Sequence, residues 1–335
     1  MKFLKYIGIL LGVLILGYLL ACFFGPKNLN IEQSKTIEAS APIIFNLINN
    51  VEKWDKWNDW NLQDTGMVIT YSDKKDGVGA RSEWAKSSFG DGSQEIVESV
   101  ENEKIKTRLN FGRWDGDNFG IFNIVPKGNT TNVSWAFEGT TLPFLMRGMM
   151  LTAKSGMKKS YAVGLDNIAK MAAERVNNLY NGYQIKEVDL GEKNFIMNRQ
   201  EVKIENIQQF YATNLGQLFG KVQGAGVEMN GMPCGLFFRM DERDGMIDMA
   251  AAIPIMEAIS LAGANSFNVV ARKALQIDYM GDYHGVSNAH HAMDEYMKDR
   301  GFLQDDPVIE EYVTDPGTEP DPSKWLTRLT YYYSE

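Results

Sequence analysis

"VSNAHHAMDEYMKDRG", residues 286–301, predicts a helix, and "PVIEEYVTDP", residues 307–316, predicts the strand that follows it. A further strand pattern, "KWLTRLTYYY", ends the chain, and another, "FNVVARKALQIDYMGDY", precedes the helix. The same order of strand, helix, strand and strand occurs once before, between residues 183 and 255. Two such units in tandem indicate an internal repeat. We therefore expect the C-terminal half to be an α+β domain built from a duplicated β-α-β-β unit.

The N-terminal half shows a different order of elements. A strand pattern in "SKTIEASAP" is followed by "APIIFNLINNV", which predicts a helix with Pro42 in its first turn. From Met67 to Phe137, short alternating runs are separated by turn signals such as "DKKDGVGA", a pattern that predicts an antiparallel meander of about six strands. Apolar residues at helical spacing from Leu145 to Asn178 then predict one long helix.

The start of this half, "KTIEASAPIIFNLINNVEKWDKWNDW" (residues 35–60), resembles START-like proteins of the SRPBCC or polyketide-cyclase-like superfamily. Members begin with a strand, an alanine-proline-phenylalanine helix and a tryptophan-rich segment, and the resemblance extends from Ile31 to about Asn178. It implies a helix-grip fold, in which a curved antiparallel sheet wraps a long C-terminal helix around an apolar cavity. Many members bind lipids or other hydrophobic small molecules, and some are cyclases or dehydratases.

Three tryptophans, Trp54, Trp57 and Trp60, follow one another at a spacing of three residues. Aromatic residues at helical spacing are usually packed inside, so we expect them in the core, capping the cavity that the resemblance implies. On that basis, Trp57 and Trp60 are candidate ligand contacts. The alternative is docking at a membrane interface, where tryptophan is enriched.

The C-terminal half resembles the GyrI-like effector-binding domain, whose architecture SOUL haem-binding proteins share. The resemblance covers nearly all of residues 183–333 and rests on "YMGDYHGVSNAHHAMDEYMKDRGF", "PVIEEYVTDP" and "LTRLTYYY". In this family a glycine-x-tyrosine turn leads into a helix, an acid lies within x-E-x-Y before an aspartate-proline turn, and a final strand follows. Family proteins attached to AraC-type or MerR-type regulators carry a helix-turn-helix module. This sequence shows a membrane span instead, so we expect no nucleic-acid partner.

Two adjacent acids, Glu310 and Glu311, lie in the predicted strand. Neighbouring strand residues point to opposite faces, so Glu310 shares a face with Tyr312 and Glu311 lies on the other. Alternation leaves open which face is inside, but the acid that lies in the family's pocket matches Glu310. Burying a carboxylate among apolar groups disfavours its charged form, and a ligand cation over aromatic rings would recover that cost. Alternatively, Arg199, Arg328 or a buried water neutralises Glu310.

Four tyrosines complete the predicted ligand-binding site. Tyr312 lies two residues from Glu310, Tyr283 precedes the helix, and Tyr331 and Tyr333 share one face of the last strand. We predict that their side chains line an acidic, aromatic pocket. Tyrosine is also a favourable strand residue, so ordinary sheet packing is the alternative.

The sequence shows no catalytic or metal-binding motif. It contains neither a serine-histidine-aspartate or cysteine-histidine pattern nor a glycine loop that would cradle a phosphate. His290 with Asp294, and His291 with Glu295, are each four residues apart on the predicted helix, but a third metal ligand is not evident. We therefore predict no metal and no cofactor, and a binding protein rather than an enzyme.

Two other functions remain open at this point. One is a hydrolase or cyclase that uses Glu310 as a base, assisted by Tyr312 or Tyr283, since some GyrI-like proteins are hydrolases. The other is a ligand-sensing accessory subunit of a membrane complex, whose protein partner the sequence does not identify.

An uncharged run, "YIGILLGVLILGYLLACFF" (residues 6–24), follows Lys2 and Lys5. A helix of this length crosses a bilayer, and the preceding lysines place the N-terminus in the cytoplasm and the soluble domains on the periplasmic or extracellular side. A cleaved signal peptide is one alternative. A lipoprotein is another, because "LLAC" resembles a bacterial lipobox that ends at Cys22.

Charge is spread unevenly along the chain, whose net charge is -9. Residues 1–180 carry 21 Lys and Arg against 19 Asp and Glu, a net of +2, whereas residues 181–335 carry 13 against 24, a net of -11. An acidic C-terminal half argues against nucleic acid, which attracts basic patches. It either serves solubility or favours cationic and neutral ligands.

Together these patterns predict an α+β protein that is anchored in the membrane and binds hydrophobic or cationic small molecules. The segments are a cytoplasmic N-terminus (1–5), a transmembrane anchor (6–24), a START-like helix-grip domain (25–180) and a GyrI-like domain (181–335).

Overall fold

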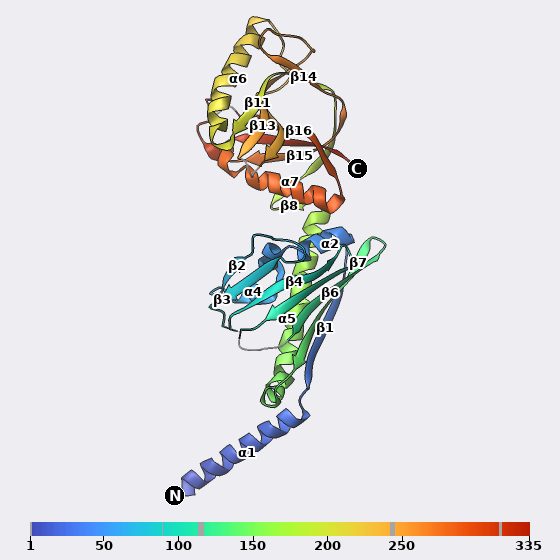
Figure 1. Cartoon of the computed structure of the whole chain (residues 1–335), viewed down its shortest axis with the longest axis vertical. Helices are drawn as coiled ribbons and strands as arrows, with labels where there is room; N and C mark the ends of the chain where they lie inside the picture. Colours follow the sequence, from blue (N-terminus) through green and yellow to red (C-terminus); the bar gives the residue numbers. More distant parts are fainter. Residues whose placement is uncertain (1, 89, 113–116, 242–244, 315–316) are drawn as a thin grey trace. The chain divides into compact units, whose positions relative to one another are not determined.

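The computed structural model describes residues 2–88, 90–112, 117–241, 245–314 and 317–335, so the turn predicted at Asp315 and Pro316 lies outside the described residues. The chain divides into two compact units, Met1–Val176 and Asn177–Glu335. Each unit combines helices with an antiparallel sheet, as the sequence predicts (Figure 1).

The first element, α1 (Lys2–Phe24), is one uninterrupted apolar helix. Residues Phe3–Phe24 have a mean hydropathy of 2.7, and nearly all of their side chains are exposed. The helix is long and apolar enough to cross a membrane, a property that a signal sequence shares. It ends before Pro26, which has no backbone N–H with which to continue a helix.

Seven antiparallel strands form the sheet of the first unit, in the order β1-β7-β6-β5-β4-β3-β2. The predicted six-strand meander corresponds to β2 through β7. Strand β1 pairs with β7 and forms one edge of the sheet. The strands are β1 (Asn28–Ile37), β2 (Val68–Tyr71), β3 (Arg81–Ala85), β4 (Gly92–Val100), β5 (Lys104–Asn110), β6 (Asn118–Lys127) and β7 (Thr130–Thr141). The short helices α2 (Ala41–Ile48), α3 (Trp54–Trp57) and α4 (Asp59–Gln63) connect β1 to β2, and α5 (Phe144–Val176) follows β7.

The long helix α5 packs closely on the sheet beside an aromatic cluster. The Trp135 ring of β7 stacks on the Tyr161 ring of α5 with 3.9 Å between ring centroids. One turn further on, a Cβ added at Gly164 would lie 2.7 Å from the Trp135 ring, a distance that real Cβ atoms do not reach. The close approach of helix and sheet at this point therefore requires glycine.

Eight antiparallel strands form the sheet of the second unit, in the order β10-β15-β17-β16-β12-β13-β11-β14. The strands are β10 (Lys186–Leu190), β11 (Lys193–Lys203), β12 (Cys234–Asp241), β13 (Met246–Ile255), β14 (Asn265–Val269), β15 (Arg272–Met280), β16 (Leu303–Tyr312) and β17 (Leu326–Ser334). Helix α6 (Ile207–Gly224) contacts β11 and β13, and α7 (Ser287–Arg300) contacts β15 and β17. A two-stranded sheet of β8 (Leu179–Tyr180) and β9 (Tyr183–Gln184) precedes them.

The two repeats exchange a short strand, which the sequence does not reveal. Each repeat was predicted to begin with one long strand, but the chain breaks that strand at Gly191 and again at Val270. The piece before the first break, β10, pairs with β15 of the second repeat, whereas β14 pairs with β11 of the first. At the centre of the sheet, β12 pairs with β16 and joins the two repeats.

Both helices of the second unit cover the same face of its sheet. Val308 packs with residues of α7, and Phe237 borders both this cluster and the one beneath α6. Ile309, the neighbour of Val308, packs instead with Cys234 and Tyr332 on the other face. Successive residues of β16 thus reach different cores, as strand alternation requires.

Candidate ligand-binding site

Glu310 lies in β16 on the face that α6 and α7 cover. Its backbone pairs with Gly235 of β12 on one side and with Leu329 of β17 on the other. Its side chain is only 12% exposed. Because β12 belongs to the first repeat and β17 to the second, the carboxylate lies where the two repeats meet.

Both oxygens of the Glu310 carboxylate have partners. His290 of α7 places Nε2 2.8 Å from Oε1, and the Tyr312 hydroxyl donates to Oε2 at 3.1 Å. The other nitrogen of His290, Nδ1, is 2.6 Å from the Tyr331 hydroxyl. The arrangement fits an imidazole whose Nε2–H donates to Glu310 while Nδ1 accepts from Tyr331, and a doubly protonated ring would instead donate at both positions.

A fifth residue, Tyr211 of α6, completes what we call the Glu310 cluster: Glu310, His290, Tyr312, Tyr331 and Tyr211. The Tyr211 ring meets the Tyr312 ring edge-on, with 5.6 Å between centroids. Its hydroxyl lies over Gly235, where an added Cβ would be 2.0 Å away. Glycine at the position paired with Glu310 therefore makes room for the Tyr211 hydroxyl.

Two buried hydroxyl oxygens, one in the cluster and one beside it, lack a hydrogen bond of normal geometry among the described residues, although the Tyr211 hydroxyl interacts with the Tyr312 hydroxyl. They are Oη of Tyr211 and Oγ1 of Thr327, a fully buried residue whose backbone pairs with Tyr312. Buried polar groups are nearly always satisfied in native proteins, so such atoms require an explanation.

The tyrosines of the cluster are neutral hydrogen-bonding groups at ordinary pH. Burial raises the pKa of Tyr312 well above its usual value, and the negative charge of Glu310 raises it further. Burial and Glu310 have the same effect on the pKa of Tyr211. Burial also raises the pKa of Tyr331, with contributions from Asp294 and Glu310.

Aromatic contacts extend the cluster beyond Tyr312. The Tyr283 ring lies 5.4 Å from the Tyr312 ring and 5.0 Å from the Trp325 ring, measured between centroids. The Trp325 Nε1–H donates to the Glu319 carbonyl oxygen, which holds the indole in place. Sequence reasoning predicted Tyr283 and missed Trp325, which has no regular spacing from the other aromatic residues.

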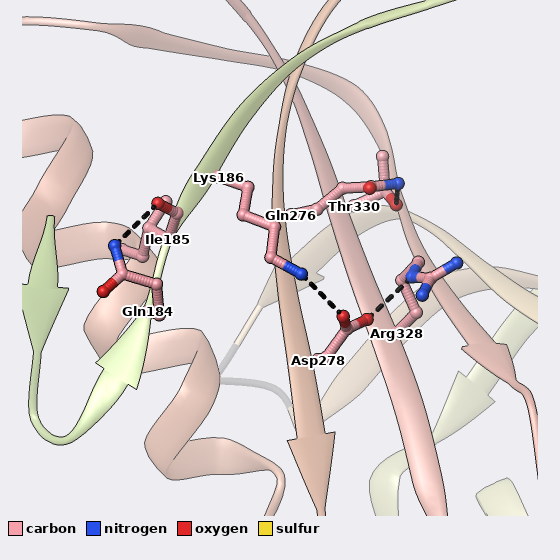
Figure 2. Close-up of polar contacts among 7 residues, drawn as sticks. All are labelled: Gln184, Ile185, Lys186, Gln276, Asp278, Arg328 and Thr330. Carbon is pink, nitrogen blue, oxygen red and sulfur yellow. Dashed lines mark hydrogen bonds and ion pairs between the residues drawn. The ribbon is translucent and has the colours of Figure 1, made fainter.

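The predicted basic partners of Glu310 are bound elsewhere. Arg199 forms a two-point ion pair with Asp248, and Arg328 donates to Asp278 at 2.7 Å. Figure 2 shows Asp278 between Arg328 and Lys186. Neither arginine therefore neutralises Glu310, whose observed basic partner is His290.

The sequence suggested only one role for His290, that of a metal ligand. Its approach to Glu310 spans 20 residues and depends on how α7 lies on the sheet, so no local spacing predicts it. Among the described residues, no group of three or more His, Cys, Asp or Glu is arranged to hold a metal ion.

Glu311 lies on the opposite face and has a structural contact. One of its carboxylate oxygens accepts a hydrogen bond from the Met232 backbone N–H at 3.2 Å, next to Gly231. A Cβ added at Gly231 would lie 2.8 Å from that oxygen, and the backbone there has a φ of +138°. The carboxylate thus holds the loop that leads into β12.

Tyr333 is not part of the Glu310 cluster. It is buried in the core beneath α7, and its ring stacks on Phe302 with 4.2 Å between centroids. Sharing a face with Tyr331 therefore brought Tyr333 into the same core but not to the carboxylate.

The two tryptophans predicted as ligand contacts lie in the first unit. Trp57 is buried, donates its Nε1–H to the Leu47 carbonyl oxygen at 3.1 Å, and meets the Trp135 ring edge-on. Trp60 is half-buried and meets the rings of Trp135 and Tyr161 edge-on. Both pack in the aromatic core between the sheet and α5.

Comparison with known families agrees with these two architectures. Residues 28–173 match the family described as polyketide cyclase / dehydrase and lipid transport, and residues 183–330 match the GyrI-like small molecule binding domain. The chain therefore consists of an N-terminal START-like domain of the SRPBCC type joined to a C-terminal GyrI-like domain. Both domains have folds of families that bind small molecules.

Solved structures with similar folds have low sequence identity. The C-terminal domain of EcmrR matches 46% of this chain and 98% of its own, with 17% identity and a TM-score of 0.40. EcmrR in a complex with DNA matches 57% of this chain and 72% of its own, with 15% identity and a TM-score of 0.43. A hydrolase from Listeria innocua matches 45% of this chain and 91% of its own, with 14% identity and a TM-score of 0.34. Similarity at this level carries no functional argument, and no curated protein matches the chain.

Proposed function

We propose that the protein is a membrane-anchored binding protein for hydrophobic or cationic small molecules. The observation that carries this proposal is the Glu310 carboxylate, buried among tyrosine rings at the junction of the two repeats. A buried carboxylate favours a cationic ligand, and the faces of Tyr312, Tyr211 and Tyr283 would add cation–π attraction.

A ligand cation would have to replace His290 as a partner of the Glu310 carboxylate. Removing one partner from a buried charge pair is costly unless another group replaces it. In the structure, His290 and Tyr312 satisfy the carboxylate. A ligand ammonium or other cation would take over the place of His290, and its polar groups would reach the hydroxyls of Tyr211 and Thr327.

The START-like domain would supply a second, more apolar site. Its family includes lipid-transport proteins, and its sheet wraps α5 as a helix-grip fold does. Trp57 and Trp60 lie between the sheet and the helix, where an apolar ligand would contact them.

The N-terminal helix would keep both domains at a membrane. Its apolar surface is exposed over the whole length of a bilayer-spanning helix, an area that is unfavourable in water. We propose an uncleaved single span with the N-terminus in the cytoplasm and both domains exported. Cleavage or lipidation at Cys22 are the alternatives that intact mass measurement would detect.

The test is calorimetric titration of the full chain in nanodiscs with tetraphenylphosphonium, a lipophilic cation. Triphenylphosphine oxide, a neutral analogue, and empty nanodiscs are the controls. We expect Glu310→Gln to weaken binding of the cation by at least about tenfold, equivalent to about 1.4 kcal/mol, and to leave binding of the neutral analogue unchanged. Glu311→Gln, on the opposite face, should bind the cation as the unchanged protein does. Equal affinity of Glu310→Gln and the unchanged protein would exclude Glu310 as the binding group.

A second function is favoured by one observation. Glu310 is hydrogen-bonded to both His290 and Tyr312, an arrangement in which the carboxylate can act as a general base. A hydrolase of this kind would turn over small electrophilic esters, and Glu310→Gln would abolish that turnover. Binding of the cation without turnover of any such ester would favour the binding protein.

A further inference from the structure

The first two turns of α5 expose an unusual amount of apolar surface. Four large apolar side chains within eight residues are between 42% and 60% exposed. They are Phe144 (42%), Leu145 (60%), Met149 (48%) and Leu151 (50%). The other face of the same turns carries Met150, which is buried in the core of the domain. These four side chains, which we call the α5 tip, thus form an apolar surface that the domain itself does not cover.

The exposed face of α5 changes character along the helix. Beyond the α5 tip, the same face carries Ser155 and Gly156 and then Lys158 and Lys159, all exposed. The one charged residue within the α5 tip segment is Arg147, which is half-buried and donates its Nε–H to the Leu142 carbonyl oxygen. A largely apolar end followed by lysines about two turns later is the pattern of a segment that enters a lipid leaflet and leaves its charges at the headgroups.

Contacts with α1 place the α5 tip at the depth of the apolar span. The Tyr18 hydroxyl donates to the Leu145 carbonyl oxygen at 2.6 Å, and the Cys22 thiol lies 3.5 Å from the same oxygen. A Cβ added at Gly148 would be 2.9 Å from the Cys22 sulfur, so the two helices are in close contact. Tyr18 precedes Phe24, the last residue of the span, by six residues. At 1.5 Å per residue this is about 9 Å along the axis of α1.

We propose that the α5 tip is immersed in the lipid leaflet that contains the C-terminal end of α1. It would be a second membrane contact of the START-like domain. This inference rests on the proposed membrane span of α1. Leu145, hydrogen-bonded to Tyr18, would lie below the hydrocarbon boundary. Lys158 follows Leu145 by 13 residues, or about 20 Å along the helix, and would lie outside that boundary, within reach of lipid phosphates.

The consequence is a domain held at a defined depth and orientation instead of one tethered by a flexible linker. The α5 helix runs from the leaflet into the aromatic core of the START-like domain, where Tyr161 stacks on Trp135. Lipid would cover the α5 tip. A protein partner or a second copy of the chain are the other possible occupants of this surface, and the experiment separates them.

The experiment is spin-label accessibility on the full chain in nanodiscs of phosphatidylglycerol and phosphatidylcholine. Labels are placed by Leu145→Cys and Met149→Cys, with Leu11→Cys in the middle of α1 and Val125→Cys in β6 as controls. Val125 is 51% exposed and matches the α5 tip in exposure. The native Cys22 and Cys234 are buried, and the unchanged protein treated with the same reagent measures their background.

We expect labels at residues 145 and 149 to collide with oxygen more often than with a water-soluble nickel chelate, as the label at residue 11 should. The label at residue 125 should show the reverse. If residue 11 is in lipid but residues 145 and 149 collide mainly with nickel, the α5 tip is in water and the inference is wrong. If residues 145 and 149 meet neither reagent, protein covers the surface, which also overturns it. A nickel-accessible residue 11 would instead refute the membrane span itself.

Discussion

The two domains use buried aromatic rings in different ways. In the START-like domain, Trp135 and Tyr161 stack at 3.9 Å among apolar neighbours, and burial alone raises the pKa of Tyr161. In the GyrI-like domain, Tyr312 and Tyr211 meet edge-on beside a carboxylate, and the charge of Glu310 adds to the effect of burial on their pKa values. The first cluster is a packed aromatic core, whereas the second combines packed rings with a buried carboxylate.

The same contrast appears in how each cluster makes room for its rings. Gly164 lets α5 approach the Trp135 ring, and Gly235 lets the Tyr211 hydroxyl approach the strand that carries Glu310. In the first case glycine permits ring packing. In the second it permits a polar group to reach the position beside a buried acid. Substitutions in the two clusters should therefore affect different properties of the protein.

The largest effect is expected for Trp57→Ala in the START-like core. Trp57 is buried edge-on against Phe122 and Trp135, so its truncation leaves a cavity and should cost about 3–5 kcal/mol of the domain's stability. Thermal unfolding of the full chain should show one transition moved to lower temperature. Binding of tetraphenylphosphonium below that transition should be unchanged, and a parallel loss of cation binding would contradict the separation of the two clusters.

A smaller loss is expected for Gly235→Ala in the GyrI-like domain. The new Cβ would overlap the Tyr211 hydroxyl and should cost about 1–3 kcal/mol in overpacking. Tyr211→Phe removes that hydroxyl, so the double variant should recover part of the lost stability. Unfolding measurements on the two single variants and the double variant give the coupling between the sites. Strictly additive losses would show that the hydroxyl is not the group that requires glycine.

The smallest effect is expected for His290→Gln. His290 contacts one oxygen of the Glu310 carboxylate, the place that a ligand cation would take. Removing this competing partner should raise the affinity for tetraphenylphosphonium by about threefold, within the usual contribution of one hydrogen bond.

The matched control for this prediction is His291→Gln. Both variants change a histidine of α7, but His291 is exposed and His290 contacts the carboxylate. Calorimetric titration should show a changed affinity for His290→Gln and the original affinity for His291→Gln. Equal affinities of the two variants would show that His290 does not compete with the cation.

Much of the fold could be predicted from the sequence because it depends on local patterns. Hydrophobic periodicity and turn residues predicted the meander, the long helix α5 and the duplicated β-α-β-β unit. The exchange of β10 and β14 between the repeats was missed, because pairing between distant strands leaves no local signal. Strand alternation alone placed Glu310 and Glu311 on opposite faces, and the structure shows a separate contact for each.

What the sequence determined by itself is therefore the kind of each segment: an apolar helix, a START-like domain and a GyrI-like domain with an acid beside a tyrosine. The tertiary structure alone decided which groups meet that acid. The pairing of β12 with β16 brings Gly235 and Tyr211 to Glu310, and the packing of α7 brings His290. The physical reason is that side-chain periodicity follows from local backbone geometry, whereas the neighbours of a buried charge are set by contacts between elements far apart in the chain.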